Sequence, residues 1–193
     1  MRSIVIAALI LTLGACAGVP QLPQVPGGQK VTQAGVSFVA PANKSWSVLV
    51  QSTYQFTLGA NGDNPNETLI ANVSTYQIPT FSSPQDFLTY VKSGRAGEPK
   101  TGRFEVVKND EQLYAERAET CVKHETESKD YGAKRDGDYT IIQYFGMNCI
   151  HPKNPTVGIF VEFSRKAPPS IEYPQFKPLG SQLLKSVEFS AYK

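Results

Sequence analysis

The first sixteen residues determine which part of this chain folds, and in which compartment. A single positive residue, Arg2, precedes residues 4–13, which are apolar apart from Thr12 and lead into Leu13-Gly14-Ala15-Cys16. About ten apolar residues are too few to cross a hydrocarbon core, which takes roughly 20. A charged start, a short apolar core and small residues before a break are typical of a secretory signal peptide. We therefore expect residues 1–15 to be removed and the remainder to fold outside the cytoplasm.

The end of this signal resembles the lipobox of bacterial lipoproteins, in which cleavage occurs before a cysteine that becomes lipid-modified. The resemblance covers residues 1–16 and implies that acylated Cys16 anchors the protein in a lipid bilayer. In that family, Ala17 after the cysteine (rather than aspartate) implies sorting to the periplasmic face of the outer membrane. Several acyl chains give stable anchoring where one is marginal. The alternative is an ordinary signal cut near Ala15, with Cys16 a bystander.

A segment rich in proline and glycine follows the cysteine, with Pro20, Pro23, Pro26 and Gly27-Gly28. Proline at every third position favours extended polyproline II at about 3.1 Å per residue, so this segment reaches roughly 40 Å. We expect residues 16–33 to form a lipidated stalk and residues 34–193 to form a single folded domain.

The charge balance excludes a nucleic-acid partner. The whole chain carries a net charge of +2, and removal of the signal takes Arg2 with it, which leaves the mature protein nearly neutral. A protein that binds the phosphate backbone needs a basic surface. About 160 residues remain beyond the stalk, which is enough for one domain with its own core.

Apolar residues in the folded part recur mostly with period two, which predicts half-buried strands. The predicted strands are 36–38, 46–50, 54–58, 69–78, 104–107, 157–163 and 187–189, and a long hairpin has 113–124 and 139–150 as its arms. Its tip, residues 125–138, is rich in charge and contains Asp136-Gly137, a turn signal.

Two helices are predicted between these strands. For the first, Ser83 is the expected N-cap, Pro84 the first helical residue and Gly94 the C′ residue, and Asp86 completes a capping-box spacing. Its buried face comprises Phe87, Leu88 and Val91. The second helix follows Pro174 and has a buried face of Phe176, Leu179, Leu183 and Leu184.

This order predicts an α+β fold with an antiparallel sheet and helices packed on it. Three segments carry a resemblance to the PsbP-like family: Gly35-Val36-Ser37-Phe38-Val39-Ala40-Pro41 leading to Trp46, then Pro84-Gln85-Asp86-Phe87-Leu88-Thr89-Tyr90, and finally Leu183-Leu184-Lys185-Ser186-Val187-Glu188-Phe189. The likeness implies an accessory or binding protein rather than an enzyme.

The two remaining cysteines, Cys121 and Cys149, fall on the two arms of the predicted hairpin. Their symmetric placement about its tip predicts a cross-strand disulfide, which an oxidising compartment keeps formed. The alternative is a zinc site with His124 and His151. A register that pairs the cysteines puts the imidazoles roughly 15 Å apart, since strands rise about 3.3 Å per residue. We therefore expect no metal.

The sequence contains no nucleophile elbow, no zinc-protease motif and no phosphate-binding glycine loop. The leading hypothesis is a non-enzymatic, membrane-tethered binding or accessory domain of the cell envelope, without a cofactor, whose partner is an envelope protein or component. The alternative is an exported hydrolase or small-ligand-binding protein. The predicted partner contact is the charged hairpin tip, through Lys129, Lys134, Arg135 and Asp136.

Overall fold

The computed structural model describes residues 21–190 apart from 34, 43, 97–101 and 133–137. Its main sheet has eight strands, and all neighbours run antiparallel. Their spatial order is β1 (Gln24–Val25), β4 (Trp46–Gln51), β5 (Gln55–Asn61), β6 (Thr68–Gln77), β10 (Asn154–Ala167), β9 (Thr140–His151), β8 (Cys121–Asp130) and β7 (Phe104–Leu113).

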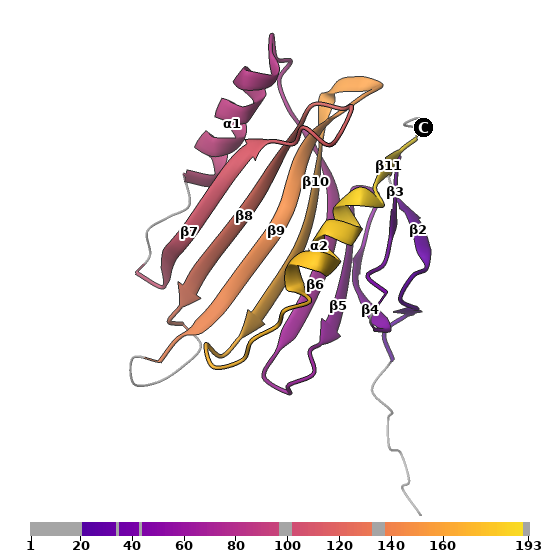
Figure 1. Ribbon diagram of the computed structural model, residues 1–193. Helices are drawn as coiled ribbons and strands as arrows, with labels where there is room; N and C mark the ends of the chain where they lie inside the picture. Colours follow the sequence, from indigo (N-terminus) through magenta and orange to yellow (C-terminus); the bar gives the residue numbers. More distant parts are fainter. Residues whose placement is uncertain (1–20, 34, 43, 97–101, 133–137, 191–193) are drawn as a thin grey trace, which may run out of the picture.

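A smaller sheet and two helices complete the domain (Figure 1). The smaller sheet orders β11 (Glu188–Phe189), β3 (Val36–Val39) and β2 (Lys30–Gln33). Helix α2 (Phe176–Lys185) crosses one face of the main sheet, whereas α1 (Pro84–Ala96) lies at the end formed by β7 and β8. The prediction of a single domain with an antiparallel sheet and packed helices is confirmed, in a fold that is α+β or mainly β, and the PsbP-like likeness stays a prediction.

The main core lies between α2, the smaller sheet and one face of the main sheet. Alternate residues of the central strands point into it, as period two requires. Phe176 of α2 stacks on Phe163 of β10 at 5.3 Å between ring centroids, and Trp46 of β4 meets the same ring edge-on at 6.2 Å. The predicted apolar face of α2 is confirmed, because all four of its residues are buried.

A second core lies on the opposite face, beneath α1. Phe87, Leu88 and Val91 pack there against Val122 of β8 and Ile78 after β6. The predicted N-cap is confirmed, since the Asp86 backbone N–H donates to Ser83 Oγ at 3.2 Å. The predicted C′ glycine is wrong, because the helix continues through Gly94 to Ala96.

The predicted disulfide joins Cys121 to Cys149, which lie directly opposite each other in the β8–β9 register. Both cysteines are buried in the main core. With a sequence separation of 28, the chain-entropy estimate gives a stabilisation of about 3–4 kcal/mol.

The hairpin that carries the disulfide differs from its prediction at both ends. Residues 114–120, expected inside one arm, form the connection between β7 and β8, and β7 extends to Leu113 instead of ending at 107. At the other end, pairing continues from the cysteines to Asp130 opposite Thr140, so residues 125–130 belong to a strand and not to the tip. Asp130 is fully buried and forms ion pairs with Arg103 and Lys166. The inward-facing positions at this end of β8 are therefore polar, and the alternation of apolar residues does not predict the strand here.

The expected stalk is also shorter than predicted. Residues 24–25 pair with β4, and residues 30–33 pair with β3. These two strands lie at sheet edges, and Val25 is their one buried residue. Their sequences therefore lack the apolar alternation that would predict them. The folded domain therefore begins at least ten residues before the predicted boundary at residue 34.

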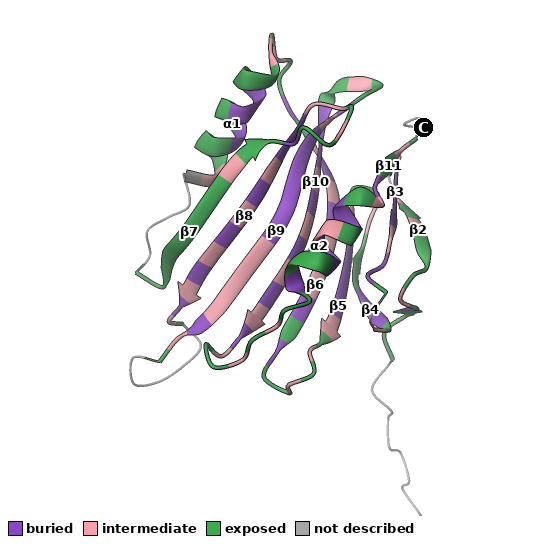
Figure 2. Ribbon diagram, viewed as in Figure 1, coloured by how far each residue is buried: buried purple, intermediate pink, exposed green. Residues whose placement is uncertain are grey.

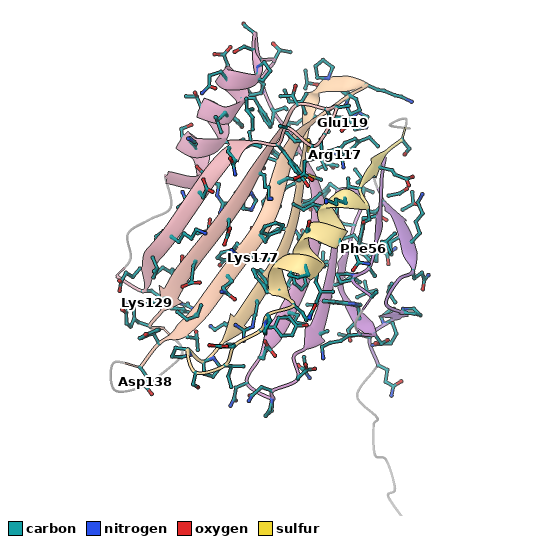
Figure 3. The ribbon with its side chains drawn as sticks, viewed as in Figure 1. Phe56, Arg117, Glu119, Lys129, Asp138 and Lys177 are labelled. Atoms are coloured by element: carbon teal, nitrogen blue, oxygen red, sulfur yellow. A yellow bond between two sulfur atoms is a disulfide. The ribbon has the colours of Figure 1, made fainter. Side chains whose placement is uncertain are left out.

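Figure 2 shows how burial is distributed over the main sheet: the central strands are largely buried, and β7 is exposed along most of its length. The connection from β7 to β8 is attached to the far end of α2 by Arg117, which donates from Nη1 and Nη2 to the Val187 carbonyl at 3.2 Å (Figure 3). Near the other end of α2, Lys177 pairs with Glu125 of β8 at 2.6 Å.

Candidate functional site

The residues that the sequence singles out for partner contact are only partly described. Lys129 lies in β8, not in a tip, and its Nζ contacts Glu105 Oε1 at 3.1 Å and lies 5.2 Å from the ring centroid of Tyr139 (Figure 3). Lys134, Arg135 and Asp136 fall outside the described residues, so the partner contact there stays a prediction. Cys16 also falls outside them, and its acylation stays a prediction.

A groove of about 330 Å³ lies between α1 and the face of the main sheet that α2 leaves uncovered. Strands far apart in the sequence form its floor and the last turns of α1 form its wall. The residues that line it are Ser74, Tyr76, Tyr90, Val91, Gly94, Arg95, Asn148 and Phe160. Aromatic and aliphatic surface with a few convergent polar groups is the usual character of a small-molecule site.

Tyr76 and Asn148 form the polar end of this groove. The Tyr76 hydroxyl donates to Asn148 Oδ1 at 2.9 Å, which links β6 to β9 across β10. The tyrosine ring lies over Gly158 of β10, where a Cβ would come within 2.6 Å of it, so only glycine permits this crossing. Burial, reinforced by Tyr90, raises the pKa of Tyr76 above its ordinary value. Tyr76 therefore carries a neutral hydroxyl whose proton is donated to Asn148.

Arg95 forms the charged end, and its charge is balanced. Its Nε lies 2.9 Å from Glu111 Oε1 on β7, and its Nη2 donates to Thr126 Oγ1 on β8 at 2.8 Å. Thr126 in turn donates to Asn109 Oδ1 at 2.8 Å. These contacts hold the end of α1 against two strands, and the neighbouring carboxylate leaves this part of the groove without net charge.

His124 supports the groove from within the sheet. Its ring lies nearly parallel to Phe160, at 4° and 5.8 Å between ring centroids, and its Nε2 lies 3.2 Å from Glu162 Oε2. The ring crosses Gly146 of β9, where a Cβ would lie 2.5 Å from Nε2. His124 Nδ1 has no hydrogen-bond partner among the described residues. The histidine therefore sets the position of Phe160 without lining the groove.

The environment of His124 predicts a pH-dependent stability. Burial lowers the pKa of His124 below 6.5, against the opposing hydrogen bond to Glu162, and Arg95 lowers it further while Glu111 raises it. Because the unfolded chain binds this proton more readily, the free energy of unfolding is expected to fall as pH drops below about 6.5, by at most about 1.4 kcal/mol per pH unit.

Urea unfolding of the wild type and of His124→Gln, across the range from neutral to mildly acidic pH, measures this effect. Glutamine keeps a donor for Glu162 but does not titrate, so the variant should lose the part of the slope that the histidine contributes. An unchanged slope in His124→Gln would show that other groups cause the dependence.

The two histidines and the two cysteines do not converge on a metal. The disulfide consumes both sulfurs, His124 faces Glu162, and His151 Nε2 lies 3.1 Å from the Ser190 carbonyl oxygen. Across the part of the chain that the structure describes, no three histidine, cysteine, aspartate or glutamate side chains are grouped to hold a metal ion.

A larger cavity, of about 410 Å³, lies between the start of α2 and the loop that follows β10. Gln143 Nε2 donates to Glu127 at 3.0 Å, and Gln143 Oε1 accepts from Arg165 Nη1 at 3.3 Å. Arg165 also donates from Nε to Glu67 and from Nη2 to the Ile171 carbonyl, the latter at 2.7 Å. These polar groups bond to one another and hold the loop after β10 against the sheet. We therefore assign them a structural role.

The sequence contains signals for the groove, although alternation alone does not reveal it. Phe160 stands between Ile159 and Val161, so this part of β10 is apolar on both faces, which indicates that something covers each of them. Tyr76 is likewise a large aromatic residue on the polar side of its strand. The prediction of Gly94 as the C′ residue places Arg95 in a loop, whereas the structure places Arg95 in the last turn of α1.

No protein-family model matches the chain, and no curated protein matches its sequence. Among solved structures it is similar to a protein of Bacteroides thetaiotaomicron, with 12% identity and a TM-score of 0.42 over 89% of this chain and 50% of that one. It is also similar to LpqN of Mycobacterium tuberculosis, described as involved in cell envelope biogenesis, with 10% identity and a TM-score of 0.47 over 88% of this chain and 91% of that one.

The chain thus spans about half the length of the Bacteroides protein. Neither likeness extends to sequence, so both describe the backbone alone. Within the residues that the structure describes, no helix is both long enough and apolar enough to cross a membrane.

Proposed function

We propose that the mature protein is a lipid-anchored, non-enzymatic binding protein of the bacterial cell envelope, and that the groove beneath α1 is its ligand site. The lipobox-like end of the signal supports the anchor. The buried disulfide supports export, because such bonds persist in oxidising compartments. The groove supports binding, and it is the observation that carries the proposal.

The chemistry of the groove favours binding over catalysis. The hydroxyl of Tyr76 donates to an amide oxygen, which is not a base. The nearby imidazole of His124 is buried behind Phe160, and its Nε2 faces Glu162. A hydrolytic site with a side-chain nucleophile needs that nucleophile within hydrogen-bond reach of a base, and the described contacts of the groove contain no such pair.

The lining also defines the class of ligand. Phe160, Tyr90 and Val91 offer flat and apolar contact, whereas Asn148 and Ser74 offer hydrogen bonds to the edge of a ring. Because Glu111 balances Arg95, the groove has little preference for a charged group. A volume of about 330 Å³ is near the lower end for ligand pockets. These features fit one small, uncharged ring that carries hydroxyl or amide groups.

Gly94 allows a direct test of the site. A Cβ at this position would meet no atom within 4 Å, so a larger side chain fits the backbone. Glycine inside a helix costs about 0.5–1 kcal/mol relative to alanine, so replacing it should not destabilise α1. We expect Gly94→Trp to fill the groove and abolish binding without lowering Tm. Ser93→Trp, on the neighbouring exposed position, is the matched control.

Ligand-induced shifts in Tm measure the effect, with benzamide and N-acetylglucosamine as neutral probes and benzoate and benzylamine as charged ones. Neutral probes should raise Tm for the wild type and for Ser93→Trp, and should leave Gly94→Trp unchanged. Binding that survives Gly94→Trp would place the ligand elsewhere. A preference for benzoate or benzylamine would contradict the proposed ligand class.

A further inference from the structure

The point at which the chain enters the main sheet lies close to the predicted anchor. Because residues 24–25 already pair with β4, only six positions separate Cys16 from Leu22. A fully extended chain covers at most about 3.6 Å per residue, so this connection reaches no more than about 22 Å. When Cys16 is acylated, the β1–β4 edge of the domain is therefore held beside the bilayer.

Four exposed apolar side chains occur along this edge, and we name them the anchor-side patch: Leu22, Leu49, Val50 and Tyr54. Their exposed fractions are 48%, 46%, 40% and 59%. The Val48 backbone N–H donates to the Pro23 carbonyl at 2.8 Å, which places Leu22 next to Leu49 across the β1–β4 pair. A bulge between Val48 and Val50 interrupts the pairing of β4 with β5, and the side chain of Leu49 lies over Gly59 of β5.

The charge distribution suits contact with a phospholipid surface. Between Leu22 and Tyr54 the charged residues are Lys30 and Lys44. Lys30 pairs with Glu188 and Lys44 pairs with Asp63, each at 2.6 Å. Bacterial phospholipid surfaces that contain phosphatidylglycerol are anionic and repel carboxylates. Because each of these carboxylates is paired with a lysine, the apolar edge meets such a surface with little electrostatic penalty.

We infer that the anchor-side patch rests on the lipid bilayer, so that the domain is docked on the membrane instead of being held away from it. This inference depends on the lipid anchor of the proposed function. Leucine and valine enter the boundary between headgroups and acyl chains, and Tyr54 lies at headgroup level, where amphipathic rings are favoured. Docking also sets the opposite edge, β7, farthest from the membrane across the width of the main sheet.

Fluorescence quenching by brominated lipids tests the inference. The full-length lipidated protein is reconstituted in vesicles of phosphatidylethanolamine and phosphatidylglycerol with brominated acyl chains. Leu49→Trp reports on the patch. Val107→Trp, on β7 at the other edge and 51% exposed, is the matched control. The native Trp46 is fully buried and contributes the same background to both.

We expect the fluorescence from position 49 to be largely lost in brominated vesicles and that from position 107 to be unchanged. Adding Leu22→Ser and Val50→Ser to Leu49→Trp should restore the signal while the protein still sediments with the vesicles. Sedimentation without quenching at position 49 would overturn the docking and leave the anchor standing. Failure to sediment would overturn both.

Two further outcomes would also contradict the inference. Equal quenching at positions 49 and 107 would show that the domain has no fixed orientation on the bilayer. A dimer in detergent that Leu49→Ser converts to a monomer would show that a second copy of the chain covers the patch.

Discussion

Replacing Arg165 by methionine is expected to destabilise the domain by about 3–5 kcal/mol, because it leaves the buried carboxylate of Glu67 without its counter-charge. Both side chains are almost completely buried, with Arg165 4% and Glu67 2% exposed. The same change also frees the loop that the guanidinium holds through the Ile171 carbonyl. At about 2–4 °C per kcal/mol for a domain of this size, Tm should fall by roughly 10 °C.

Lys177→Met is the matched control for this substitution. Lys177 pairs with Glu125 at 2.6 Å, but its side chain is 60% exposed, and exposed ion pairs contribute at most about 1 kcal/mol. Thermal and urea unfolding of the two variants should therefore separate them clearly. Equal losses of stability in the two variants would show that the buried Arg165–Glu67 pair contributes no more to the free energy of unfolding than an exposed pair does.

Replacing Cys16 by serine is expected to release the protein from the membrane completely. Stable attachment depends on acyl chains, and Cys16 is the residue that the lipobox-like signal assigns to carry them. Fractionation of envelopes should recover the wild type with the membranes and the variant in the soluble fraction. A mass measurement of the mature N-terminus should find the acyl groups on Cys16 of the wild type alone.

The fractionation is carried out at low salt and at high salt, because the anchor-side patch is expected to add weak contact with the membrane. Four partly exposed side chains provide far less apolar contact than acyl chains, so the patch orients the domain but does not retain it. Co-sedimentation of Cys16→Ser with membranes under both conditions would contradict the lipid anchor. Recovery of the wild type in the soluble fraction, without acyl groups, would instead favour an ordinary signal peptide cut near Ala15.

Local patterns predict the elements of this fold because their causes are local. The cap of α1 depends on Ser83 and a backbone N–H three residues away, so the spacing alone reveals it. The disulfide can also be predicted from the sequence, because two cysteines placed symmetrically about a turn face each other in an antiparallel pair. The apolar face of α2 follows from helical periodicity.

The ends of the elements are less predictable, because distant partners decide them. Asp130 extends β8 beyond its apolar residues, since Arg103 and Lys166 approach it from other segments. Arg103 is the main cause that holds the pKa of Asp130 far below its usual range, so the carboxylate stays charged while buried. Likewise, α1 passes Gly94 because Arg95 finds Glu111 and Thr126 across the sheet.

The groove escapes sequence reasoning for the same reason. It combines side chains of β6, α1, β9 and β10, and no short motif relates them. Gly158 and Gly146 fall inside predicted strands without any special role, and only the structure shows that the rings of Tyr76 and His124 cross them. The density of charge in the hairpin leads to its prediction as a contact site. The residues of the groove form no motif that would single them out in the sequence.

Native mass spectrometry of the lipidated protein, extracted from envelopes in mild detergent, tests the central claim most directly. The account predicts that the wild type and Ser93→Trp carry a small, uncharged molecule of constant mass, and that Gly94→Trp carries none. The three proteins should be equally folded and equally acylated on Cys16. A wild type without any bound molecule, or the same bound mass on Gly94→Trp, would contradict the assignment of the groove beneath α1 as the ligand site.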